Sequence, residues 1–199
     1  TPDWLSFFMF TYFTDRDGKM QLESLAQSGF DPLSRTCRFM LTEEAHHMFV
    51  GETGVGRTIQ ATVDAMTAAG ITDPYDMNRI RDLGVIDLPS IQKKLNLHYS
   101  LSLDLFGNEV STNAANAFNA GIKGRYMEHR LDDDHQLQRD TYDVKMVRDD
   151  QIITEQMPAL NAINMRLRDD YVKDASGGLN RWNKICLLYT SPSPRDSLE

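Results

Sequence analysis

The first part of the chain has the hydrophobic pattern of two long helices joined by a short turn. Residues 4–28 lack proline and contain one internal glycine, Gly18, after a dense run of aromatic side chains. Gly29 is the type of residue that ends a helix in the left-handed conformation, and a hydrophobic side chain such as Phe30 commonly follows it. We therefore expect a first helix over residues 4–28.

A second helix is expected to begin at Asp31 and Pro32, because aspartate is a good N-cap and proline fits the first helical position. It should run to residue 50 and then be interrupted or thinned by three glycines in residues 51–56, since glycine weakens a helix interior. Small residues at this spacing also allow another helix to approach closely. The helix should resume and stop at Gly70.

Shorter elements are expected in the rest of the chain. The pattern predicts helices over residues 74–84, 89–126 and 158–175, the last stopped by Gly177-Gly178. Alternating segments on either side of Asp149-Asp150 favour one small hairpin, over residues 142–156. The sequence therefore predicts an all-α fold with one small hairpin.

Composition excludes several classes of function. The chain has 199 residues, of which 41% are hydrophobic and 25% charged, as in ordinary globular proteins. Its net charge of −8 offers no basic surface for nucleic acid or for an anionic membrane. The longest apolar run, residues 4–13, is far shorter than the roughly 20 residues of a membrane-spanning helix. Two cysteines, Cys37 and Cys186, and no recognisable signal peptide favour a cytoplasmic location.

Both ends of the sequence are unusual. The chain begins with Thr1 rather than methionine, and residues 187–199 show no periodicity. This last segment is similar to the translated vector tails found on incomplete gene products. We therefore expect residues 186–199 to be non-native, and the chain to be a fragment of a longer protein.

Two motifs are similar to known binding loops but lack parts that those loops require. Residues 51–58, GETGVGRT, resemble a phosphate-binding loop with Arg57 in place of its lysine, but the preceding residues favour helix rather than the required strand. Residues 15–19, DRDGK, resemble the middle of a calcium loop, with Gly18 at its sixth position. The first and twelfth positions of that loop would then be Phe13 and Ser24, where an oxygen ligand and a glutamate are required, so a calcium loop is not expected.

A candidate metal site lies in residues 42–49, TEEAHHMF. The segment contains Glu-x-x-His twice, as Glu43/His46 and Glu44/His47. Residues three apart share a helical face, so a carboxylate and an imidazole can bind one ion, as they do in ferritin-like di-iron bundles. For the motif by itself, a solvated charged surface is the simpler interpretation.

The expected pair of helices brings Asp15 to the level of this motif. Asp15 lies about 20 Å before the turn, and Glu44 and His47 lie about 18–22 Å after it, at 1.5 Å per residue. A carboxylate that directly follows an aromatic run needs a partner when it is buried, and a metal ion is one. Two carboxylates and an imidazole suit iron or manganese. Asp132 and His135 share the spacing but lie in an acidic run, and we interpret them as surface groups.

Three longer segments carry a resemblance to a known family. They are residues 3–60, which begin DWLSFFMFTYFTDRDGK, residues 98–126, HYSLSLDLFGNEVSTNAANAFNAGIKGRY, and residues 167–185, LRDDYVKDASGGLNRWNKI. Over essentially all of residues 1–185 the chain resembles the oxygenase components of benzoyl-CoA 2,3-epoxidases, which are similar to other ferritin-like di-iron oxygenases.

The resemblance implies a ferritin-like di-iron bundle, of which this chain holds part of the four-helix core and additional C-terminal helices. It implies two iron ions that activate O2 and epoxidise the ring of benzoyl-CoA during aerobic benzoate degradation. Electrons would come from NADPH through a separate reductase that contains FAD and iron–sulfur clusters. The fragment alone is expected to be inactive.

The same resemblance selects Asp15, Glu44 and His47 as iron ligands, with Glu44 able to bridge the two ions. Glu43 and His46 then point about 100° away, toward a supporting or a surface role. The remaining ligands are expected upstream of the first residue. No further catalytic or substrate-binding residue is identified.

The implied organisation has three parts. Residues 1–70 hold the ligand half of the bundle, residues 71–185 are the C-terminal helical part of the same domain, and residues 186–199 are the tail. Three alternatives remain open: a non-catalytic helical scaffold, another ferritin-like di-iron oxygenase acting on an aryl-CoA, and a nucleotide-binding protein that uses residues 51–58.

Overall fold

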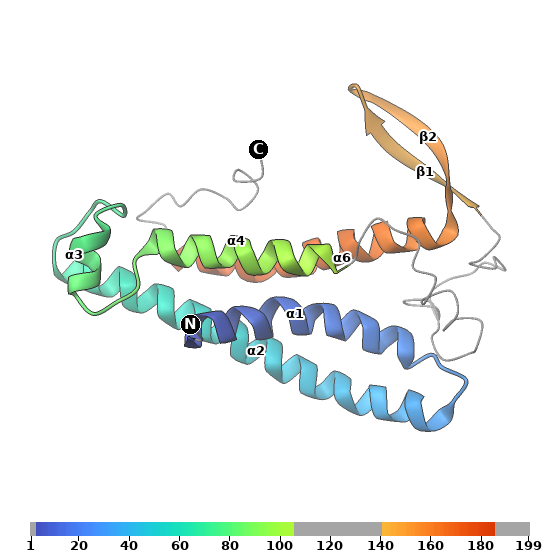
Figure 1. Ribbon diagram of the computed structural model, residues 1–199, viewed down its shortest axis with the longest axis horizontal. Coiled ribbons are helices and arrows are strands. Elements are labelled where there is room, and N and C mark those ends of the chain that lie inside the picture. Colours follow the sequence, from blue (N-terminus) through green and yellow to red (C-terminus); the bar gives the residue numbers. More distant parts are fainter. Residues whose placement is uncertain (1–2, 106–140, 186–199) are drawn as a thin grey trace. The chain divides into compact units, whose positions relative to one another are not determined.

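The computed structural model describes residues 3–105 and 141–185, most of which are helical (Figure 1). The expected mostly helical fold with one small hairpin is confirmed. In chain order the described elements are α1 (Trp4–Leu25), α2 (Asp31–Ala68), α3 (Met77–Asp82), α4 (Leu88–Asp104), β1 (Thr141–Arg148), β2 (Gln151–Pro158) and α6 (Ala159–Ile185).

The chain forms two compact units, and neither is a single stretch of sequence. The described part of the first unit comprises residues 3–17, 44–104 and 172–185, and the second contains residues 18–43, 105 and 141–171. Helices α1, α2 and α6 each contribute residues to both units. The boundary at residue 70, expected from the sequence, stays a prediction.

Helix α1 ends at Leu25. The prediction that Gly29 ends it in the left-handed conformation is wrong, because the φ angle of Gly29 is not positive. The Ser34 hydroxyl instead donates to the Ala26 carbonyl at 2.6 Å, which satisfies an acceptor left free at the helix end. Phe30 is exposed, so it does not form the expected hydrophobic contact.

Helix α2 runs for 38 residues without a break, so the expected interruption at its glycines is wrong. The close approach of another helix explains them instead. A Cβ at Gly51 would lie 2.6 Å from backbone atoms of Phe8 and Tyr12, and one at Gly54 would lie 2.3 Å from the Phe8 ring. The glycines therefore let α1 pack directly against α2 in the first unit. Gly70, with a φ of 66°, stops the helix as predicted.

Helix α6 continues through Gly177 and Gly178 to Ile185, so the predicted stop at this pair is wrong. A Cβ at Gly178 would lie 2.1 Å from the hydroxyl of Tyr12. That hydroxyl donates to the Ala175 carbonyl at 2.8 Å and accepts a hydrogen bond from the Gly178 amide at 3.0 Å. Gly178 therefore makes room for a buried tyrosine of α1 and does not end the helix.

Aromatic and charged contacts join α6 to α1 and α2 in the first unit. The Trp182 ring lies 4.7 Å from that of Tyr12 and 6.2 Å from that of Phe13, measured between centroids. Its Nε1–H donates to the Glu52 carbonyl at 3.0 Å. The Arg181 guanidinium binds both oxygens of the Glu52 carboxylate, with 2.7 Å between Nη2 and Oε2.

A capped turn joins α3 to α4. Asp87 is buried and accepts hydrogen bonds from the Ser90 amide and hydroxyl, each at 2.9 Å, and from Arg81 Nε at 2.6 Å. Burial alone would raise the pKa of Asp87, but these hydrogen bonds outweigh burial and hold that pKa below its ordinary value. The expected continuation of α4 toward residue 126 lies outside the described residues.

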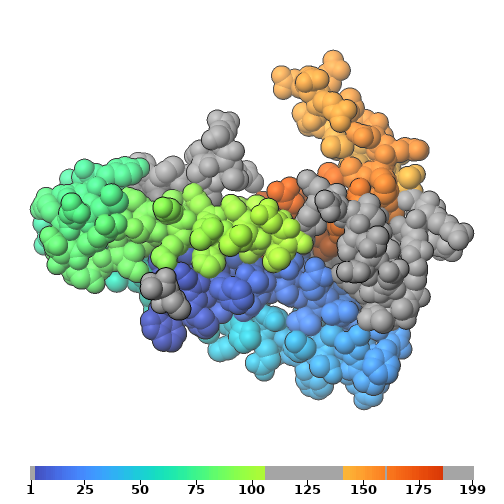
Figure 2. Space-filling view, in the orientation of Figure 1, coloured from blue at the N-terminus to red at the C-terminus, as the bar shows by residue number. Residues whose placement is uncertain are grey.

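Strands β1 and β2 form the predicted hairpin, with Thr141 paired to Pro158 at its open end. Asp149 and Asp150 have φ angles of 52° and 60°, the left-handed values that a two-residue type I′ turn requires. The hairpin is the orange ribbon that extends from the beginning of α6 in Figure 1, and Figure 2 shows its surface in the same colour.

Candidate metal centre

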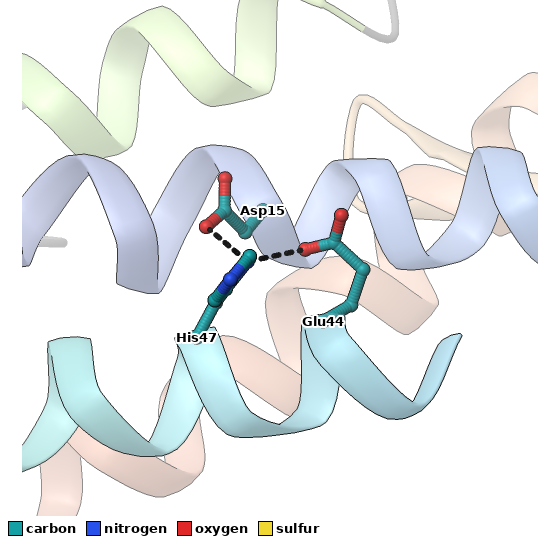
Figure 3. A group of neighbouring side chains, drawn as sticks. All are labelled: Asp15, Glu44 and His47. Atoms are coloured by element: carbon teal, nitrogen blue, oxygen red, sulfur yellow. Dashed lines mark ion pairs between the residues drawn. The ribbon is translucent and has the colours of Figure 1, made fainter. Parts of the chain in front are cut away.

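Helices α1 and α2 bring three potential metal ligands together in the first unit (Figure 3). Asp15 extends from α1, and Glu44 and His47 extend toward it from positions one turn apart on α2. The close helix contact at Gly51 begins about one turn beyond His47, which keeps the two helices near each other at this level. The structure thus places side by side the three residues selected from the sequence, which we call the acidic triad.

The separations within the acidic triad suit a shared cation. His47 Nδ1 lies 3.5 Å from Asp15 Oδ2 and 3.6 Å from Glu44 Oε2. One ligand atom from each residue lies within 4.8 Å of the others. Oxygen and nitrogen atoms that bind one ion at about 2.0–2.2 Å stand roughly 3–3.5 Å apart. Small side-chain adjustments would therefore bring all three atoms onto one ion.

Burial makes the two carboxylates of the acidic triad electrostatically unfavourable without a partner. The side chains of Asp15 and Glu44 are 18% and 17% exposed. Glu44 Oε2 is inaccessible to solvent and accepts no hydrogen bond from the described residues. Burial raises the pKa of Asp15, and burial together with repulsion from Asp15 raises the pKa of Glu44, while His47 opposes both shifts. A bound cation would remove this penalty.

The neighbouring Glu-x-x-His frame faces elsewhere. Glu43 and His46 are both exposed on α2. Neither belongs to a group of described side chains that is close enough to share a metal ion. A surface position, one of the two alternatives left open by the sequence, therefore describes both residues.

The two loop-like motifs are helical in the structure. Residues 51–58 lie inside α2, so the alternative of a phosphate-binding loop between a strand and a helix is wrong. Residues 15–19 lie inside α1, which agrees with the exclusion of a calcium loop. Asp132 and His135 lie outside the described residues.

An ion pair between the buried Arg16, next to Asp15 in the chain, and Asp174 was not predicted from the sequence. Arg16 is 6% exposed, and its Nη1 donates to Asp174 Oδ2 on α6 at 2.5 Å. Its guanidinium also lies 4.4 Å from the centroid of the Tyr12 ring. Burial is the main cause that raises the pKa of Tyr12 to about 12, so this tyrosine stays protonated. Arg16 therefore fixes the helical turn that carries Asp15 against α6.

Comparison with known proteins shows what the chain is similar to. No protein-family model matches the chain. Over 185 residues the chain is 57% identical to a protein named benzoyl-CoA oxygenase component B, from Aromatoleum evansii. The chain is a homologue of this oxygenase component. The alignment covers 93% of the chain but 38% of the relative, so the chain spans well under half of the relative's length.

The homology to benzoyl-CoA oxygenase component B confirms the resemblance read from the sequence. The mostly helical fold of the described residues agrees with the helical bundle that this resemblance implies. Among the described residues no helix is long and apolar enough to cross a membrane.

Proposed function

We propose that this chain is part of an oxygenase component that epoxidises the ring of benzoyl-CoA at a di-iron centre. The observation that carries the proposal is the acidic triad, in which the buried Glu44 Oε2 accepts no hydrogen bond from the described residues. The name of the homologous protein supplies the substrate class and the reaction class.

The donor set of the acidic triad fits iron. Two carboxylates and one imidazole suit a hard or borderline ion such as ferrous or ferric iron, which binds oxygen and nitrogen ligands. A Glu-x-x-His pair on one helix and a carboxylate on another make half of the ligand set of a ferritin-like di-iron site. We propose that Asp15, Glu44 and His47 would hold iron at this site, and that the other ligands lie outside the described residues.

The bound irons would supply the reductive activation of O2. One oxygen atom would enter the ring as the epoxide, and the other would leave as water with two electrons and two protons. We propose NADPH as the electron source, acting through a separate reductase that contains FAD and iron–sulfur clusters. The rings of Tyr12 and Phe13, which precede Asp15 on α1, are buried and pack against Trp182 of α6, so this part of α1 is shielded from water.

Iron binding to the full chain tests the proposal. Anaerobic titration with ferrous iron, followed by desalting and metal analysis, should show retained iron in the unaltered chain. Asp15→Asn, Glu44→Gln and His47→Ala should each weaken iron binding by about tenfold or more, in line with the effect of losing a metal-site group.

The exposed neighbours of the acidic triad provide matched controls for this titration. Glu43→Gln and His46→Ala make the same chemical changes on the same helix, and both should bind iron like the unaltered chain. Equal iron retention in all five variants would overturn the ligand assignment. It would favour the non-catalytic scaffold.

A further inference from the structure

Beside the acidic triad, α1 and α2 also line a cavity of about 540 Å³ in the first unit. This volume lies within the range typical of small-molecule sites, which are mostly apolar with a few polar groups. The apolar part of the wall includes Phe8, Phe49, Val50 and Ile86, and Arg57 is the charged residue among the described residues that line it. The cavity therefore suits a ligand that is largely apolar and carries a negative charge.

The position of the cavity follows from helix periodicity. Val50 and Gly54 lie about one and two turns after His47 on nearly the same face of α2, and Phe8 lies about two turns before Asp15 on α1. The cavity thus begins near the acidic triad and extends along the helix pair, with Arg57 about 15 Å farther along α2 than His47.

Arg57 is available to bind a ligand. It is exposed and forms no hydrogen bond or ion pair with the described residues. A guanidinium presents its donors in a planar fork that matches phosphate oxygens. The hydroxyl-bearing side chains of Thr53 and Thr58 line the cavity on either side of it.

We propose that this cavity binds an aryl-coenzyme A thioester, with the ring directed toward the acidic triad and a phosphate held by Arg57. The pantetheine arm, which separates the ring from the phosphates, would lie along the apolar wall. The inference rests on the proposed function for the aryl-CoA class, but binding requires no metal. In this proposal Arg57 of the GETGVGRT motif binds a phosphate, although the motif is part of a helix and not a phosphate-binding loop.

Calorimetric titration of the metal-free full chain with benzoyl-CoA tests this assignment. Loss of a charge-assisted hydrogen bond should weaken binding about tenfold or more in Arg57→Ala, with a smaller loss in Arg57→Lys. Arg38→Ala, an exposed position on the same helix outside the cavity, should bind like the unaltered chain. Added salt should weaken binding by the unaltered chain more than binding by Arg57→Ala.

A second measurement locates the ligand without changing Arg57. Ala61 lines the cavity and is exposed, so Ala61→Cys should react with a maleimide, and benzoyl-CoA should slow that reaction. Cys37 is buried, and the unaltered chain gives the background from its own cysteines. Equal affinity of Arg57→Ala and the unaltered chain, or no protection at Ala61→Cys, would overturn the proposal.

Substitutions in the acidic triad test iron binding separately from benzoyl-CoA binding in the cavity. If Glu44→Gln loses iron and still binds benzoyl-CoA in an Arg57-dependent way, both assignments stand as independent sites. Iron binding by the triad without any benzoyl-CoA binding would overturn the cavity assignment alone. Arg57-dependent binding of benzoyl-CoA, with iron retained in every triad variant, would overturn the metal site alone.

Discussion

Burial disfavours the charged form of the Glu44 carboxylate. Burial and repulsion from Asp15 raise its pKa in the folded chain above the ordinary value of 4.5. A carboxyl whose pKa is raised on folding favours the folded state when it is protonated, and this contribution is lost as the pH rises through the raised value. At neutral pH the metal-free site is therefore destabilising.

Glu44→Gln should accordingly stabilise the metal-free chain. At pH 7 we expect a higher melting temperature than that of the unaltered chain, because the amide carries no charge to bury. The difference should shrink as the pH falls toward 4.5, where the native carboxyl becomes protonated. Thermal unfolding followed by circular dichroism at both pH values measures this, and Glu43→Gln, at an exposed position, should show no such trend. A lower melting temperature for Glu44→Gln at pH 7 would contradict the burial argument.

The Arg16–Asp174 pair gives a second prediction at this scale. Asp174→Asn leaves the buried guanidinium of Arg16 without its ionised partner and should reduce the free energy of unfolding by about 1–3 kcal/mol. The pair of Arg166 and Asp170, which lie 4.0 Å apart on α6, provides the control because its arginine is exposed. Asp170→Asn should change stability by less than about 0.5 kcal/mol in the same urea titration, and equal effects of the two substitutions would refute the distinction.

Single residues differed in how far the sequence predicted their role. Helical spacing was enough to bring Asp15, Glu44 and His47 to one level, because all three lie within two helices joined by a short turn. The contact between Arg16 and Asp174 joins residues 158 positions apart. No local pattern encodes such a pair, so only the folded chain shows it.

At the scale of elements, glycines were the least predictable residues. Gly70 ends α2 as expected, whereas Gly54 and Gly178 lie inside long helices. Their positions are explained by Phe8 and Tyr12, which pack where a Cβ would otherwise stand. Local propensity treats a helix breaker and a packing glycine alike, and the two differ only in their tertiary contacts.

Two substitutions in α2 test this explanation. Gly54→Ala should destabilise the chain by about 1–3 kcal/mol, because the new methyl group would lie 2.3 Å from the Phe8 ring. Gly56→Ala meets no atom closer than 3.6 Å and should stabilise the helix by up to about 1 kcal/mol. Chemical denaturation of the two variants should therefore give shifts of opposite sign, and a shift of the same sign in both would contradict close packing as the role of Gly54.

At the scale of the whole molecule, the sequence predicted the mostly helical fold and the hairpin correctly because both follow from hydrophobic periodicity and turn residues. The division into two units could not be predicted, since α1, α2 and α6 each contribute to both. The proposed function gives the fold and the acidic triad a common interpretation as part of an iron-dependent oxygenase. This interpretation depends most on whether the imidazole of His47 binds iron.

X-ray absorption at the iron K-edge of the iron-loaded chain tests this dependence most directly. Imidazole bound to iron gives a characteristic multiple-scattering signal. We expect this signal in the unaltered chain and in His46→Ala, and its loss in His47→Ala. Persistence of the signal in His47→Ala, or its loss in His46→Ala, would contradict the metal centre proposed for this chain.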